Sequence, residues 1–119
     1  MTRAARSIFI FGVYLLATGV VLFALPNVLL GVLGLPRTSE PWIRVAGIPI
    51  GIMGTFHIAA ARAELVPFFR YTVWARPIVL LGIATLVLLR LAPPILLLFG
   101  VVDAAGAAWT RAALRGGAA

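Results

Sequence analysis

The chain has 119 residues, of which 63% are hydrophobic and 11% are charged, and its mean hydropathy is +1.14. Soluble domains carry about 25% charged residues, so this composition excludes a water-soluble globular protein. The net charge of +7 is carried entirely by arginine, but no solvated basic surface is large enough to follow a phosphate backbone, which excludes nucleic acid as a partner. The absence of cysteine excludes thiolate metal sites and thiol redox chemistry.

The first half of the chain contains two predicted spans. A membrane-spanning helix needs roughly 20 residues, so a chain of this length accommodates about four. The first is predicted over residues 8–25, because Pro26 cannot continue a regular helix without the loss of a hydrogen bond. Residues 27–35 are apolar but too few to cross, and they predict a short interfacial or re-entrant helix. The second span is predicted over residues 43–61.

The second half contains two more spans, over residues 71–90 and 95–113. Arg76 and Pro77 fall within the first turns of the third span, which predicts a kink there. Pro77 and Pro49, in the second span, are therefore candidate hinges. The predicted fold class is all-α: a single domain over residues 1–119 with four transmembrane helices in an antiparallel bundle, plus the short interfacial helix.

The arginines are distributed unequally between the two sides of the predicted bundle. Seven fall on one side: Arg3, Arg6, Arg62, Arg70, Arg76, Arg111 and Arg115. Three fall on the other: Arg37, Arg44 and Arg90. Because loops rich in arginine stay in the cytoplasm, we expect a multi-pass protein of the cell inner membrane with both termini cytoplasmic.

Small residues form stripes on two of the predicted spans. In the second span, Gly47, Gly51 and Gly54 lie within roughly 60° of one another on the helix surface. In the fourth span, Gly100 and Gly106 occupy one face. Such stripes let a neighbouring backbone approach closely, so these five glycines are predicted helix-packing positions.

Asp103 is the sole acid within a predicted span, on the same face as Gly100 and Gly106. A charged aspartate at the centre of an isolated span costs about 2.5–3.5 kcal/mol on insertion scales, which the fold must offset. Three interpretations follow. Asp103 forms a buried ion pair with Arg76 or Arg44, it binds a proton or cation, or it pairs with a group of a partner subunit.

His57 is the only histidine in the chain. A metal site needs three or four ligands, so no metal or other cofactor is predicted. The remaining interpretations are a buried structural histidine, a proton relay with Asp103 or Glu64, and an axial ligand that would colour the protein. No serine, histidine and acid share a segment, so there is no nucleophile with its base, and we expect no enzymatic activity.

Several features together resemble a group of known proteins. They are the four short spans, the basic amino end, the sequence Trp42-Ile-Arg44-Val-Ala-Gly47 and the late Asp103. This pattern resembles small four-helix bacterial inner-membrane proteins of the DoxX-like and related uncharacterised families. The resemblance implies a membrane partner of redox or stress systems and carries over no site residue. Small multidrug exporters match in size, but their essential glutamate lies in the first span, where this sequence has none.

The function we expect is that of an accessory or structural subunit in a homo-oligomeric or hetero-oligomeric membrane assembly. Its partners would be the lipid bilayer and either a second copy of the chain or another membrane subunit. The alternative is a minimal proton-coupled transporter or channel, in which Asp103 titrates and Arg76, Arg44 and His57 tune it. No residue pattern specifies a substrate.

Overall fold

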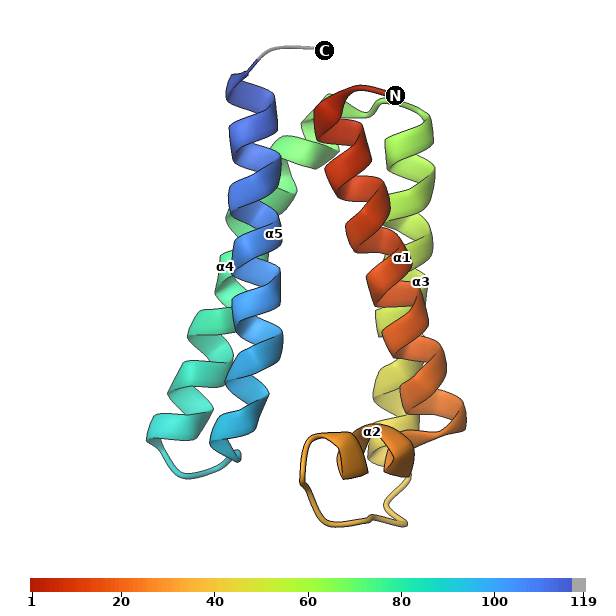
Figure 1. Cartoon of the computed structure of the whole chain (residues 1–119), viewed down its shortest axis with the longest axis vertical. Coiled ribbons are helices and arrows are strands. Elements are labelled where there is room, and N and C mark those ends of the chain that lie inside the picture. The colour runs from red at the N-terminus through yellow and green to blue at the C-terminus, as the bar shows by residue number, and fades with distance from the viewer. Residues whose placement is uncertain (117–119) are drawn as a thin grey trace. The chain divides into compact units, whose positions relative to one another are not determined.

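A computed structural model describes residues 1–116; residues 117–119, the end of the predicted domain, lie outside the described part. The described chain forms helices joined by turns and loops (Figure 1). They are α1 (Arg3–Ala24), α2 (Pro26–Val32), α3 (Trp42–Arg62), α4 (Val66–Leu88), the short 3₁₀ helix η1 (Pro94–Leu96) and α5 (Leu97–Arg115). Four segments are long and apolar enough to cross a membrane: α1, α3, α4 and Pro94–Arg115. The predicted all-α fold with four spans and a short helix after the first is confirmed.

The chain divides into two compact units. One contains residues 1–8 together with the chain from Ala60 onward, and the other contains Phe9–Ala59. The boundaries fall inside α1 and α3, so each of these helices contributes to both units. Each unit is described by itself below.

In the unit of residues 9–59, α1 and α3 lie side by side (Figure 1). The segment between them, residues 25–41, contains α2 and is held by backbone and side-chain hydrogen bonds. Pro26 occupies the first turn of α2, where a missing N–H costs little. The helix ends at Val32, and Gly34 follows with a φ of +73°, which suits a residue without a side chain. The N–H of Leu35 donates to the carbonyl of Leu30 at 2.8 Å. The side-chain amide of Asn27 then exchanges two hydrogen bonds with the backbone of Thr38, which ties the loop to α2.

The other unit contains the hairpin of α4 and α5, which lie side by side (Figure 1). Helix α4 begins at Val66, five residues before the predicted span at residue 71. The reason is Pro67, which fits the first turn of a helix because the N–H it lacks would have no partner there. The apolar stretch before residue 71 is therefore part of the helix. Pro77 lies inside α4 and Pro49 inside α3, and both helices continue past them.

The turn between α4 and α5 is built on two helix-terminus devices. Arg90 adopts a φ of +59°, and the N–H of Leu91 donates to the carbonyl of Leu86 at 2.8 Å, which closes the end of α4. Pro93 and Pro94 follow and start the next helical segment. The two helices then approach closely at Gly100, where an added Cβ would lie 2.7 Å from the Cα of Leu80.

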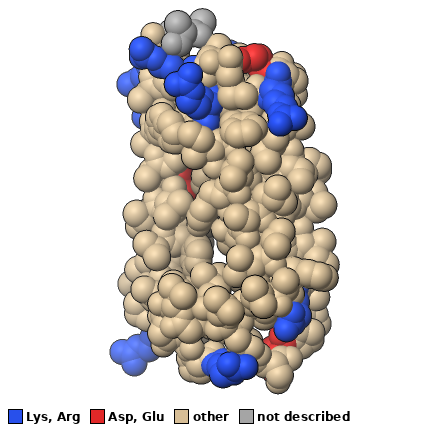
Figure 2. Space-filling view, turned by 45° about the vertical axis from the view of Figure 1, so that its right-hand side comes forward, with Lys and Arg blue, Asp and Glu red and all other residues tan. Residues whose placement is uncertain are grey.

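The buried side chains are few and mostly small, whereas large apolar side chains are exposed along α1, α3, α4 and α5. Most of the surface in Figure 2 carries neither basic nor acidic side chains. In water such a surface would cause aggregation, but in a bilayer the acyl chains solvate it. The exposed apolar side chains thus agree with a multi-pass membrane protein. Those on α4 include Trp74, Ile78, Leu81 and Leu88.

Candidate functional site

The hydroxyl of Thr110 is the centre of a buried polar cluster that joins three helices. Thr110 lies on α5 and is fully buried. Its Oγ1 lies 2.8 Å from the hydroxyl of Ser7 on α1 and accepts a hydrogen bond of 2.7 Å from Nη2 of Arg76 on α4. It also lies 3.1 Å from the carbonyl of Gly106, to which it donates. A threonine hydroxyl offers one donor and two acceptor positions, so this single group links all three elements.

Arg76 is buried, and the cluster determines where its guanidinium points. Its Nε donates to the carbonyl of Thr72 and its Nη2 to the hydroxyls of Thr72 and Thr110. Thr72 lies one turn toward the start of α4, so the side chain extends toward the helix amino end, as side chains on a helix generally do. The positive charge is thus displaced from the middle of α4 toward Thr72, and the two hydroxyls provide it with partners.

Asp103 is 9% exposed and lies on the face of α5 that contacts α4. Gly100, against Leu80, and Thr110, against Arg76, occupy the same face. Thr110 lies seven residues beyond Asp103, or about 10 Å along the helix. The charges of Asp103 and Arg76 attract each other. The hydrogen bonds of Arg76 that define its direction, however, go to the two threonines on the far side of the cluster from Asp103.

A second polar contact, at the surface, holds the start of α1. The hydroxyl of Thr2 accepts a hydrogen bond from the N–H of Ala5, as an N-cap residue does. The carboxylate of Glu64, in the turn between α3 and α4, accepts the N–H and the hydroxyl of Thr2, both at 2.8 Å. Glu64 therefore serves the role that a glutamate three residues after the cap has in a capping box, but from a distant part of the chain. These hydrogen bonds, the backbone N–H first, lower the pKa of Glu64.

Arg44 and His57 belong to the unit of residues 9–59 and have local partners there. Nη1 of Arg44 donates to the carbonyls of Phe23 and Ala24, at 2.7 and 3.3 Å, and so caps the end of α1. The ring of His57 is buried, with Nδ1 2.7 Å from the carbonyl of Met53. Because a carbonyl only accepts, Nδ1 carries the proton, and the ring lies 5.5 Å from that of Phe11.

Glycines let α1 and α3 approach until their backbones touch. A Cβ on Gly19 would lie 2.4 Å from the nitrogen of Gly51, and one on Gly47 would lie 2.6 Å from the carbonyl oxygen of Gly19. One turn and more along the pair, a Cβ on Gly54 would lie 2.5 Å from the nitrogen of Leu16, and one on Gly12 would lie 2.8 Å from the Cβ of His57. Real Cβ atoms essentially never come this close, so any larger residue would separate the helices.

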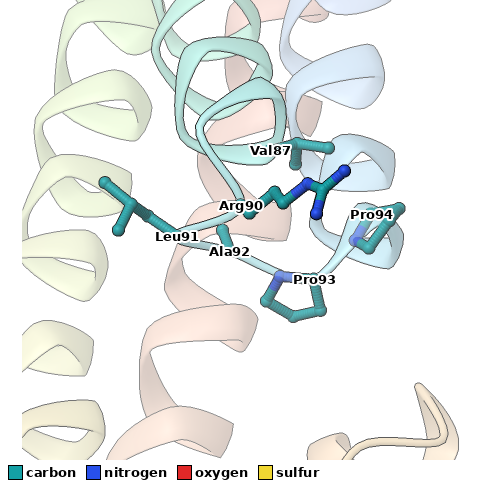
Figure 3. A pocket seen from close by; sticks show the side chains of 6 residues that line it. All are labelled: Val87, Arg90, Leu91, Ala92, Pro93 and Pro94. Carbon is teal, nitrogen blue, oxygen red and sulfur yellow. The ribbon is translucent and has the colours of Figure 1, made fainter.

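A shallow, open pocket of about 420 Å³ lies at the turn between α4 and α5 (Figure 3). Its lining residues are Val87, Arg90, Leu91, Ala92, Pro93 and Pro94. Figure 3 shows the Arg90 guanidinium between the side chains of Val87 and Pro94. The pocket offers a single charged group and no acid or nucleophile, so its lining provides no catalytic chemistry.

Several of these positions were not singled out by the sequence analysis. Ser7, Thr72 and Thr110 are ordinary helix residues, and their convergence depends on the register between helices, which no local pattern encodes. The sequence did contain a signal for the glycines of α1 that contact α3. Gly12 and Gly19 are seven residues apart, which places them on one face of the helix. Both predicted packing glycines of α5 lie in contacts of the hairpin. Gly100 packs against Leu80, and the carbonyl of Gly106 accepts a hydrogen bond from the Thr110 hydroxyl.

Comparison with protein-family models found no match, and no curated protein or solved structure is significantly similar to the chain.

Proposed function

We propose that this chain is an integral protein of a bacterial inner membrane that acts as an accessory or structural subunit of a homo-oligomeric or hetero-oligomeric assembly. The observation that carries the proposal is the Thr110 cluster. Its hydroxyls and the Arg76 guanidinium bind one another and the backbone, and all are buried between helices. Polar side chains arranged in this way hold helices together. The exposed apolar surface of the spans is left to lipid and to partner subunits.

The unit that contains the hairpin also supports an orientation. Its end with the start of α1 and the finish of α5 carries six exposed arginines: Arg3, Arg6, Arg62, Arg70, Arg111 and Arg115. The opposite end of the hairpin carries Arg90. By the positive-inside rule, the end with six arginines lies in the cytoplasm, and both termini lie there with it.

The assembly proposal is tested by the oligomeric mass of the detergent-purified protein, measured by light scattering during size-exclusion chromatography. We expect a discrete mass above that of the 12.6 kDa monomer, and the same oligomer after chemical crosslinking in native membranes. A strictly monomeric protein in both measurements, with no other protein captured by crosslinking, would contradict it. The visible spectrum of the same sample tests the axial-ligand interpretation of His57, since a bound haem would absorb.

A minimal proton-coupled transporter is the second candidate, and Asp103 favours it. This carboxylate is buried in the hairpin, and no group among residues 1–116 donates a hydrogen bond to it. An acid inside a span is typical of proton and ion pathways. The candidate predicts proton flux into liposomes that contain the wild-type protein and none with Asp103→Asn. Equal flux in both preparations would exclude it.

A further inference from the structure

Asp103 raises a question that the structural role leaves open, because the other polar groups of the hairpin have partners and its carboxylate has none among the described donors. Thr72, Thr110 and Arg76 all make hydrogen bonds with neighbours. Asp103 is nine-tenths buried and accepts no hydrogen bond from any described side chain or backbone group. A carboxylate that is largely removed from water and has no donor is costly to keep ionised, since little replaces the water it has lost.

The position of Asp103 on α5 places this residue on the face toward α4. Gly100 lies one turn before it and contacts the backbone of Leu80. Thr110 lies two turns after it, in contact with Arg76. Both neighbours lie on the face toward α4, so the carboxylate occupies a position along the line where the two helices pack. The aspartate side chain is too short to extend its carboxylate to water at the membrane surface, as lysine and arginine can do with their charged groups.

The charges that act on this position are few. From α4, the buried charged residue is Arg76, and from the first turns of α1, the buried polar residue is the uncharged Ser7. On α5 itself, Arg111 and Arg115 are exposed. Arg76 attracts the carboxylate, but its donors extend toward Thr72 and Thr110. The guanidinium therefore influences the charge of Asp103 from a distance instead of solvating it.

The chemistry of a lone carboxylate limits the ligand it can take. Calcium needs six to eight oxygen ligands, and magnesium needs a near-ideal octahedron. The other two acids of the chain, Glu40 and Glu64, lie in connecting segments outside the spans. A proton needs one oxygen and removes the charge altogether. We propose, resting on the second candidate function, that Asp103 is a reversible proton-binding site in the hairpin of α4 and α5, and that Arg76 sets its affinity for the proton.

The test makes use of a feature of the sequence: Asp103 is the only aspartate in the chain. Aspartate labelled with carbon-13 at the side-chain carboxyl, supplied with every other amino acid unlabelled, marks this one group in the full-length protein without any mutation. Its NMR resonance in lipid vesicles then reports the protonation state as the pH is varied. We expect the resonance to pass from the acid position to the carboxylate position within the pH range over which the protein stays folded.

Variants of arginine then test the second half of the proposal. In Arg76→Gln the attraction of the guanidinium for the carboxylate is lost, so the proton should bind more tightly and the midpoint should move to higher pH. Arg76→Lys keeps a positive charge, so the midpoint of Asp103 in this variant should fall between those of the wild type and Arg76→Gln. The matched control is Arg70→Gln, an exposed arginine on the same helix, which should leave the midpoint unchanged.

Two results would overturn the proposal. A resonance that stays at one position throughout, whether acid or carboxylate, shows that Asp103 does not exchange a proton in the folded protein. A midpoint that is the same in Arg76→Gln as in the wild type removes Arg76 from the control of the site. Since the first measurement is made on the wild-type chain, a failure of Asp103→Asn to fold would not affect it.

Discussion

At the scale of single residues, the chain holds its polar groups in two quite different ways. In the interior, one hydroxyl on Thr110 serves Ser7, Arg76 and the carbonyl of Gly106. At the surface, the carboxylate of Glu64 caps the start of α1 through Thr2. The first arrangement is sheltered from water, so its loss should be costly, whereas water competes with the second.

Thr110→Val keeps the shape of the side chain and removes the hydroxyl. Because Arg76 and Ser7 would each lose a buried partner, we expect a loss of about 1–3 kcal/mol in the free energy of unfolding. Unfolding in mixed micelles with increasing denaturing detergent, followed by circular dichroism, measures it. Thr85→Val is the control, since the exposed Thr85 hydroxyl donates to the carbonyl of Leu81 on its own helix. Equal stability of both variants would show that the cluster does not tie the helices together.

The capping contact predicts a dependence on acid pH. The pKa of Glu64 is lower in the folded chain than in the unfolded one, because Thr2 donates to the carboxylate. The contact therefore contributes its full stability at a pH above the pKa of Glu64 in the unfolded chain. This stability is lost as the pH falls through the pKa of Glu64 in the folded chain. We expect a small loss of thermal stability below about pH 4, which Glu64→Gln should reduce. An identical acid-side slope in Glu64→Gln and the wild type would contradict the prediction.

At the scale of elements, two kinds of helix pairing occur. Helices α1 and α3 pack backbone to backbone through glycines on both partners, whereas α4 and α5 combine one close approach at Gly100 with polar contacts at Thr110. In a bilayer, burial of apolar surface does not drive helices together, so packing and hydrogen bonding must do so. The association of each helix pair therefore depends on the particular side chains at its contact surface.

Alanine substitutions should separate packing glycines from permissive ones. A Cβ on Gly19 would lie 2.4 Å from the backbone of α3, which cannot yield as a flexible side chain would. Gly19→Ala should therefore lower the free energy of unfolding by about 1–3 kcal/mol or more. Gly82→Ala is the matched control, because open space surrounds this glycine of α4 and alanine favours a helix by up to about 1 kcal/mol. The same unfolding assay measures both, and a tolerant Gly19→Ala would refute the close packing.

At the scale of the whole molecule, the length and composition of the helices indicate a membrane protein. Four segments within residues 1–116 reach spanning length, and their exposed surfaces are rich in large apolar side chains. Exposed arginines gather at the end of the hairpin unit that holds the start of α1 and the end of α5, with Arg90 at its other end. The bilayer is thus the environment in which this surface is stable.

The proposed topology is testable because the chain has no cysteine. Single cysteines at Gly116 and at Ser39, both exposed, provide unique labelling positions. In intact cells, a membrane-impermeant thiol reagent should label Ser39→Cys and leave Gly116→Cys unlabelled until the membrane is opened. The reverse pattern would place both termini outside the cytoplasm.

The sequence by itself determined the number of spans and the short helix after the first, because a bilayer accepts helices only within a narrow range of length and requires every backbone group to be bonded within them. It also pointed to the glycine stripe of α3, which follows from helical periodicity. The convergence of Ser7, Arg76 and Thr110, and the cap that Glu64 provides for Thr2, are matters of the tertiary structure alone. Such contacts join residues up to 103 positions apart, and they depend on the register of one helix against another, which local periodicity does not contain.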